Sequence, residues 1–208
     1  AWHNARVAMI FKKRDPSDCN NYRPISLLCI GYKMFASILL TRLREAGAEK
    51  RVWHTQFGFR RGRGTGDALF VARRVIENAW AKCDGKVILL ALDWAKAFDS
   101  IAPAALNHAL LRFGCPLQIV EMISAIYSNR RFVVSDSGAT SAQHPQHFGI
   151  SQGCPLSPFL FVMVMTVLLH DATAKLREKG GTLATEVMVN ELVYADDTLL
   201  IDVKEDVL

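Results

Sequence analysis

The sequence is organised around residues 192–201, which read LVYADDTLLI. Two short runs rich in strand-forming residues flank two consecutive carboxylates, a pattern that predicts a β-hairpin with Asp196 and Asp197 at its tip. Neighbouring aspartates repel each other at neutral pH, and a divalent cation between them removes that conflict. Mg²⁺ is commonly held by one or two carboxylates while it keeps water and phosphate ligands. The doublet therefore indicates either a metal site or plain turn chemistry, for which aspartate is also well suited.

The totals fit a globular protein that contacts phosphates. The chain has 208 residues, of which 50% are hydrophobic and 22% charged, enough for one large domain or two subdomains with a real core. The net charge of +5 hides an uneven distribution: residues 1–86 hold 17 basic and 7 acidic side chains, whereas residues 87–208 hold 8 and 13. A basic part beside an acidic part suits phosphate binding by one and cation binding by the other. Solvated surface charges would give the same totals.

The cysteines and the apolar runs favour an intracellular protein. The 5 cysteines are scattered and form no C-x-x-C pair, which is typical of reduced thiols rather than of disulfides or a zinc site. We expect no signal peptide. The longest apolar run, residues 159–169, is too short to cross a bilayer, so a buried helix and no membrane partner are expected.

The N-terminal part predicts a basic hairpin followed by a helix. Residues 5–11 and 20–28 have strand character and are joined by a polar turn, with Lys12 and Arg23 on either side of it. Lysine as a point charge and arginine as a two-pronged donor can bind a triphosphate, but a surface hairpin would look the same. Apolar residues at helical spacing predict an amphipathic helix over residues 32–46.

Residues 56–67, QFGFRRGRGTGD, form a basic glycine-rich segment. Glycine allows close backbone approach, an aromatic ring of Phe57 or Phe59 could lie against a base or ribose, and three arginines could contact phosphates: Arg60, Arg61 and Arg63. Equally, the segment could be a loop that caps the next helix, predicted over residues 68–82. The core side of that helix is expected to carry Leu69, Val71, Val75 and Ile76.

Residues 86–92, KVILLAL, predict a strand buried on both faces in the centre of a sheet. This strand delivers Asp93 at its carboxyl end, where an unpaired carboxylate is costly and needs a metal or a cation such as Lys96. Two helices broken near Gly114 are predicted over residues 104–128, and a strand over residues 131–135.

Residues 147–158, HFGISQGCPLSP, lead into an apolar helix predicted over residues 159–175. The prolines suit the first helical turn, so Gln152 should project from a rigid loop. Part of the segment also matches G-x-S-x-G, the hydrolase nucleophile elbow. A polar stretch precedes Ser151 where an elbow needs an apolar strand, and no acid separates Ser151 from the following histidine, His170. We therefore discard the hydrolase reading.

Taken together, these strings resemble a reverse transcriptase of the non-LTR (LINE-type) retrotransposon class, from about Lys12 to Ile201. The segments NYRPISLL and QFGFR resemble its early fingers motifs, LDWAKAFD resembles polymerase motif A, SQGCPLSP motif B and YADD motif C. The resemblance implies an α/β (α+β) right-hand polymerase with fingers and palm, in which helices back an antiparallel palm sheet. It places the fingers mainly in residues 1–85 and the palm mainly in 86–208.

Within the palm, the resemblance places motif A at residues 92–101, intervening helices and a fingers return at about 119–148, motif B at 149–158 and motif C at 192–201. The chain stops 11 residues after Asp197, so the later palm motifs and the thumb are expected to be absent.

The resemblance also implies roles for individual side chains. Asp93, Asp196 and Asp197 would hold two Mg²⁺ ions, with Mn²⁺ as a substitute, for transfer of a dNTP onto a primer 3′-OH. Lys12 and Arg23 would bind the triphosphate, Phe98 would exclude a ribose 2′-OH, and Gln152 would lie beside the incoming nucleotide. Template and primer contacts are expected from Tyr194, Arg60, Arg61 and Arg63. Asp99 belongs to motif A without a metal role.

The implied activity is RNA-directed DNA polymerisation, with an RNA template, a DNA primer or target and dNTP as partners. Three alternatives stay open: a catalytically silent nucleic-acid-binding remnant, a group II intron maturase-type reverse transcriptase and, disfavoured by the bulky Phe98, an RNA-dependent RNA polymerase. The family also implies intracellular action, nuclear for insertion in a eukaryote, with a cytoplasmic ribonucleoprotein stage. The sequence does not specify an oligomeric state.

Overall fold

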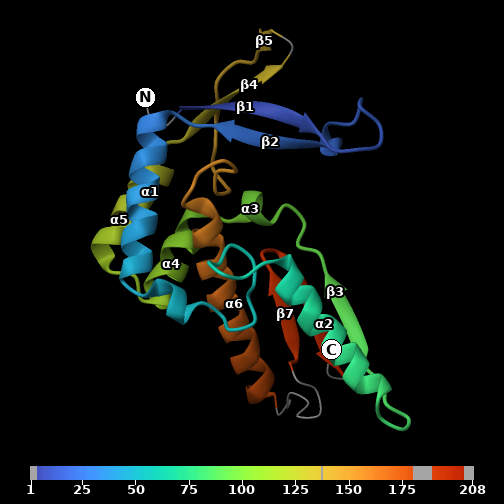
Figure 1. The fold of residues 1–208 in the computed structure, drawn as a ribbon. Helices are drawn as coiled ribbons and strands as arrows, with labels where there is room; N and C mark the ends of the chain where they lie inside the picture. Colours follow the sequence, from blue (N-terminus) through green and yellow to red (C-terminus); the bar gives the residue numbers. More distant parts are fainter. Residues whose placement is uncertain (1–3, 137, 180–188, 204–208) are drawn as a thin grey trace. The chain divides into compact units, whose positions relative to one another are not determined.

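The computed structural model describes residues 4–136, 138–179 and 189–203 (Figure 1). The chain forms two compact units, one from Ala1–Ala48 with Lys96–Phe161 and the other from Glu49–Ala95 with Val162–Leu208. Each unit therefore combines two segments that are distant in the sequence, so neither follows a single boundary at residue 85. The names fingers and palm, as assigned to residue ranges, stay a prediction.

The first unit contains a mixed sheet built on the predicted N-terminal hairpin. β1 (Asn4–Phe11) pairs antiparallel with β2 (Tyr22–Leu27), and β1 also pairs in parallel with β4 (Arg131–Asp136). Two short strands, β5 (Ala139–Thr140) and β6 (His144–Pro145), pair with β4, and a short helix, η1 (Cys19–Asn21), precedes β2. The hairpin is confirmed, whereas the parallel β1–β4 pairing joins segments too far apart for local sequence patterns to reveal.

Helices form much of the core of the first unit: α1 (Ile30–Glu45), α4 (Pro103–Phe113), α5 (Leu117–Tyr127) and the first turn of α6 (Ser157–Glu178). The short helix α3 (Ala97–Ser100) has no buried residue. The largest buried side chains there include Leu39, Leu110, Ile123 and Phe159. The predicted break between α4 and α5 is confirmed, because Gly114 ends α4 with a φ of 91°. In α1, which the sequence predicted as an amphipathic helix, Leu39 is buried, whereas Ile38 is 50% exposed.

The second unit contains an antiparallel three-stranded sheet in the order β3-β8-β7, with bounds Ile88–Leu92, Asp197–Asp202 and Glu191–Tyr194. α2 (Thr65–Trp80), preceded by the short helix η2 (Ala48–Arg51), runs beside β7 (Figure 1). Its buried Val75 packs with Leu192 and Ile201 of the sheet. An antiparallel sheet backed by a helix is therefore present, as the sequence predicted.

Two predictions about burial in this unit are wrong. β3 lies at the edge of the sheet rather than at its centre, and Leu89 and Leu90 are 41% and 38% exposed. The central strand is β8, which follows β3 by about a hundred residues. An apolar run in the sequence does not by itself show whether a strand is central or at the edge of a sheet. On α2, Val71 and Val75 face the core as predicted, but Leu69 is 69% exposed.

The apolar helix after motif B is longer than predicted. α6 spans 22 residues, Ser157–Glu178, because polar residues at its C-terminal end extend the helix beyond the apolar run. By length and composition α6 is the one helix in the described residues that could cross a membrane, a property that core helices share. Its N-terminal half is core, since Phe159–Met163 are each at most 2% exposed.

Candidate active site

The aspartate doublet lies on a two-residue hairpin turn. Tyr194 at the end of β7 pairs with Asp197 at the start of β8, so Ala195 and Asp196 form the turn. Such a turn needs a positive φ at its first position, and Ala195 supplies it with a φ of 59°. The predicted hairpin is confirmed, with Asp196 in the turn and Asp197 as the first strand residue.

The strand register brings Asp93 to this turn. The last pair between β3 and β8 joins Leu92 to Thr198, so Asp93 follows at the position that corresponds to Asp197. On the far side of Asp93, the indole Nε1 of Trp94 donates to Oγ1 of Thr198 over 3.2 Å. Both neighbours of Asp93, Leu92 and Trp94, are thus bound to Thr198, the residue that follows Asp197. Asp93 and Asp197 are exposed, and Asp196 is half-buried.

Three carboxylates at the end of one antiparallel ladder fit a hard divalent cation, which prefers oxygen ligands. In the described residues, 4–136, 138–179 and 189–203, no three His, Cys, Asp or Glu side chains are arranged as a ready metal-binding cluster, and this holds for the three aspartates as well. The backbone register, rather than a preformed cluster, therefore brings these three residues together.

In the first unit, Gln152 is held by Asp99. Nε2 of Gln152 donates to Oδ2 of Asp99 over 3.1 Å and to Oδ1 over 3.3 Å. Burial raises the pKa of the Asp99 carboxyl, whereas the hydrogen bond from Gln152 and the positive charges of Lys96 and Lys12 act in the opposite direction. Sequence reasoning gave Asp99 no role, because nothing in the motif A string shows that its carboxylate faces Gln152.

Backbone contacts join the same two segments. The N–H of Gly149 donates to the carbonyl of Ile101, and the N–H of Ile150 donates to the carbonyl of Phe98, each over 2.8 Å. Gly149 has a φ of +85°, and a Cβ there would lie 2.9 Å from Cα of Asp99. Glycine is therefore needed at position 149 both for its φ and for this close approach.

β2 is attached to the other end of the motif B loop. The N–H of Ser26 donates to the carbonyl of Gln152 over 2.8 Å, and a Cβ on Gly153 would lie 2.5 Å from the Ser26 carbonyl oxygen. Arg23, exposed and three residues before Ser26 in β2, pairs with Ile10 of β1. The hairpin that carries the predicted triphosphate residues is thus anchored directly to Gln152.

Lys12 and Phe98 belong to the same unit. Lys12 follows β1, and its N–H donates to the carbonyl of Asn21 over 2.8 Å. Its charge partly offsets the rise in the pKa of Asp99 that burial causes. The ring of Phe98 stacks on Phe161 with a centroid separation of 4.5 Å. Lys12, Arg23, Phe98 and Gln152 therefore lie in the first unit, and the three aspartates and Tyr194 in the second.

A buried arginine, Arg130, forms hydrogen bonds with the motif B loop. Arg130 is 6% exposed; its guanidinium donates to Oγ of Ser151 over 3.1 Å and to the carbonyl of Gly149, and it lies 4.6 Å from the ring centroid of Tyr127. Burial lowers its pKa and raises that of Tyr127. The sequence gave no signal for this role, since Arg130 lies outside every recognised motif.

The arginine-rich segment before α2 contacts its own backbone. Arg60 donates to the carbonyls of Glu49, Trp53 and Gln56, and Arg63 donates to those of His54 and Gln56. Oδ2 of Asp67 accepts from the N–H of Gly64 over 2.7 Å and caps α2. These contacts match the alternative in which the segment caps the next helix. Arg61 is exposed.

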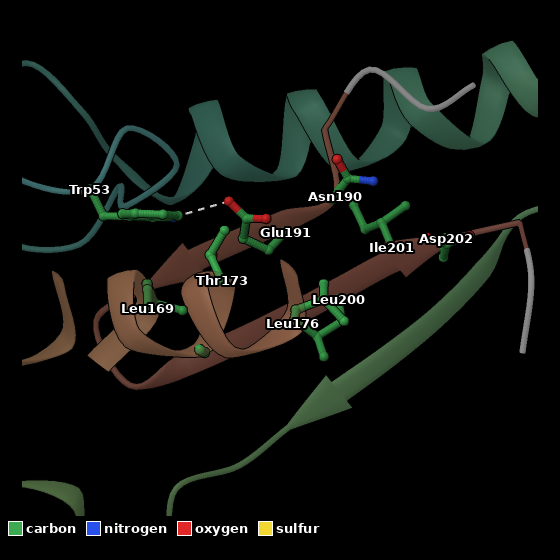
Figure 2. Close-up of a pocket in the computed structure, with 10 residues that line it drawn as sticks. Trp53, Leu169, Thr173, Leu176, Asn190, Glu191, Leu200, Ile201 and Asp202 are labelled. Atoms are coloured by element: carbon green, nitrogen blue, oxygen red, sulfur yellow. Dashed lines mark hydrogen bonds between the residues drawn. The ribbon is translucent and has the colours of Figure 1, made fainter. Parts of the chain in front are cut away.

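Two cavities of the second unit lie at opposite ends of β8. One, of about 170 Å³, lies at the Asp202 end, where Nε1 of Trp53 donates to Glu191 over 3.0 Å (Figure 2). None of the predicted site residues lines it. A second, mostly apolar cavity of about 160 Å³ lies at the other end and is lined by Tyr194, Asp197 and Leu69, among others. The second cavity is the one beside the aspartates.

The fold is that of a right-hand polymerase of the fingers and palm type. The chain is similar to the solved structure of telomerase from Candida tropicalis in complex with the TWJ fragment of telomeric RNA, with a TM-score of 0.63. At 13% identity, over 99% of this chain and 37% of that one, the likeness is one of fold.

The sequence comparisons identify the family. Residues 11–208 match the model described as reverse transcriptase (RNA-dependent DNA polymerase), and the chain belongs to this family. It is 31% identical to the RNA-directed DNA polymerase from mobile element jockey of Drosophila melanogaster, over 100% of this chain and 22% of that protein. It is also 31% identical to the Pol polyprotein of the type-1 retrotransposable element R2 of Nasonia vitripennis, over 95% and 18%.

Such relatives place the chain among reverse transcriptase domains of non-LTR retrotransposons, as its motifs predicted. The chain spans about a fifth of the length of these two relatives, at 22% and 18%. Reverse transcriptases of this family generally use divalent metal ions, and the three-aspartate set provides suitable oxygen ligands.

Proposed function

We propose that the chain carries the polymerase site of an RNA-directed DNA polymerase, which adds deoxynucleotides to a DNA primer 3′-OH on an RNA template. The single observation that carries the proposal is the register of β3 and β8, which sets Asp93 beside the doublet across more than a hundred residues of sequence. Family membership and the RNA in the similar telomerase structure support the choice of template.

Asp93, Asp196 and Asp197 would hold two Mg²⁺ ions, which Mn²⁺ could replace. Ions bound in this way supply two things: a lower pKa for the primer 3′-OH and neutralisation of the charge on the triphosphate and the leaving pyrophosphate. The three aspartates suit this role because they lie at the same end of the β3-β8-β7 sheet and because Asp93 and Asp197 are exposed.

The first unit would bind the incoming nucleotide. Lys12, directly after β1, and Arg23, within β2, would bind the triphosphate, with arginine as a bidentate donor. Phe98 would exclude a ribose 2′-OH by its bulk, and its stacking on Phe161 limits how far the ring can move aside. Gln152, oriented by Asp99, would contact the nucleotide.

Template and primer contacts are proposed for Tyr194 and the arginine-rich segment. Because Arg60 and Arg63 already donate to backbone carbonyls, the exposed Arg61 is the best placed of the three for a phosphate. Nuclear action at the insertion step also stays a proposal, which cell fractionation of a protein containing this chain would test.

Primer extension tests the proposal. A protein that includes this chain is given an RNA template, a DNA primer, Mg²⁺ and either dNTPs or rNTPs. We expect extension with dNTPs, little with rNTPs, and a loss of at least about a thousandfold in Asp196→Ala, because electrostatic stabilisation is usually the largest catalytic contribution. Asp136→Ala, which removes an exposed aspartate from β4, serves as the matched control and should extend normally.

Three outcomes would contradict parts of the proposal. Equal use of rNTPs would indicate an RNA polymerase, and an active Asp196→Ala variant would refute the metal assignment. RNA and DNA binding without any extension would favour the catalytically silent remnant.

A further inference from the structure

Gln56 is a buried glutamine that contacts the turn of the aspartate doublet. Its side chain is 1% exposed and lies in the second unit, between η2 and α2. Oε1 accepts from the N–H of Ala195 over 2.9 Å, and Nε2 donates to the carbonyl of the same residue over 3.2 Å. One side-chain amide therefore binds both polar backbone groups of Ala195, which directly precedes Asp196.

The turn needs support of this kind. Ala195 has a φ of 59°, in the left-handed region that an alanine rarely adopts and that glycine usually occupies in two-residue hairpin turns. A residue held in such a conformation stays there only when its surroundings fix it. The two hydrogen bonds from Gln56 provide that fixation, because any other backbone orientation at Ala195 would break at least one of them.

The backbone on either side of Gln56 sets its position. The N–H of Phe57 donates to the carbonyl of Val193 over 2.7 Å, and the N–H of Val193 donates to the carbonyl of Thr55 over 3.1 Å. Residues 55–57 thus run along β7 as a short parallel bridge. A Cβ on Gly58 would lie 2.2 Å from the backbone nitrogen of Ala195, so only glycine permits this approach.

The N–H of Gly58 also donates to Oε1 of Gln56, over 2.7 Å. With three hydrogen bonds and almost no exposed surface, the Gln56 amide is not available to a base or a phosphate. A direct nucleic-acid contact for this residue is therefore excluded by its burial, although the string that contains it is rich in arginine and glycine.

We propose that Gln56 is a positioning residue for the metal-binding carboxylates. By fixing Ala195 it sets the path of the next two residues, and so the direction from which Asp196 and Asp197 present their carboxylates to a divalent cation. The positioning role rests on the proposed metal role of Asp196 and Asp197. That Gln56 fixes the turn at Ala195 is independent of that role.

The test compares Gln56→Met with Thr55→Val. Methionine keeps the length and volume of glutamine and removes all three hydrogen bonds. Thr55→Val is the matched control: Thr55 is the adjacent residue, is 4% exposed, and its Oγ1 donates to Glu191, away from the turn. Both variants are first compared with the parent by circular dichroism and urea denaturation.

The first measurement is amide hydrogen exchange of residues 192–199 in the metal-free chain. We expect exchange to be at least about tenfold faster in Gln56→Met and unchanged in Thr55→Val, since protection reports local opening. If Gln56→Met does not fold, Gln56→Glu replaces it and is measured above about pH 8, because ionised glutamate keeps both acceptor contacts and sets an oxygen against the Ala195 carbonyl in place of the donor. Unchanged exchange in the folded variant would overturn the proposal.

The second measurement is Mn²⁺ binding by electron paramagnetic resonance, followed by the Mg²⁺ dependence of primer extension. We expect Gln56→Met to bind Mn²⁺ several-fold more weakly and to need several-fold more Mg²⁺ for half-maximal rate, at an unchanged KM for dNTP. Faster exchange with parental Mn²⁺ affinity would show a purely structural residue and refute the positioning role. If the parent itself does not extend primers, the proposed function fails, whereas exchange and Mn²⁺ binding still decide the role of Gln56.

Discussion

Nε2 of Gln152 lies 3.1 Å from Oδ2 of Asp99, and this contact joins two motifs that are 53 positions apart in the sequence. Asp99 is thereby a direct neighbour of the proposed nucleotide-binding glutamine. The hydrogen bonds from Gln152 and the charges of Lys96 and Lys12 favour the ionised Asp99 carboxylate, whereas its half-buried surroundings raise its pKa.

Replacing Asp99 should weaken nucleotide binding. In Asp99→Ala, Gln152 loses its acceptor and is free to rotate, so we expect KM for dNTP to rise about tenfold while kcat changes less. Hydrogen bonds to charged groups contribute about 1.5–3 kcal/mol, and the lower end applies to a half-buried pair. Steady-state extension kinetics measure the effect. Ser100→Ala, which removes a bond within α3 alone, is the control, and an unchanged KM would contradict the prediction.

Asp99 should also make stability depend on pH. Because the pKa of Asp99 is raised in the folded chain, the folded state binds more protons than the unfolded state, and stability falls as pH rises from the ordinary value of 3.8 through the raised pKa. Asp99→Asn lacks this titration. The difference in unfolding free energy, variant minus parent, should therefore increase with pH over this window in urea denaturation. A flat difference would show that burial does not shift this group.

Glycine at position 149 should be necessary for folding of the first unit. Gly149→Ala places a Cβ 2.9 Å from Cα of Asp99 at a φ of +85°, and we expect it to cost at least about 2 kcal/mol in the free energy of unfolding. Gly66→Ala is the matched variant, because no atom lies within 4 Å of its new Cβ and it sits in α2. That change should be neutral or stabilising by up to about 1 kcal/mol. Equal effects in urea would contradict this account.

Removing Arg130 should loosen the motif B loop. Arg130→Ala leaves the Gly149 carbonyl and Ser151 without their donor in a buried site, and we expect a loss of about 2–4 kcal/mol. Limited proteolysis should then cut within residues 146–152 faster than in the parent. Arg131→Ala, at the exposed neighbouring position in β4, should change stability by less than about 0.5 kcal/mol. Comparable losses in both variants would count against a supporting role for Arg130.

Local pattern was sufficient for most elements and for the family. The hairpin at residues 192–201, the N-terminal hairpin, the break at Gly114 and α2 all follow from strand alternation, helical spacing and the positions of glycine and proline. The family follows from several motifs in the correct order, because each motif is a short contiguous string. Such features depend on neighbours in the sequence, so the sequence alone reveals them.

What the sequence could not decide depends on which distant segments meet. The edge position of β3 was missed because the central strand, β8, lies about a hundred residues later. The contacts of Gln56 with Ala195, of Asp99 with Gln152 and of Arg130 with Gly149 likewise join groups that are separated in the sequence. The sequence determined which chemical groups this protein carries; only the tertiary structure decided how they are held, because hydrogen bonds and close packing depend on distance in space.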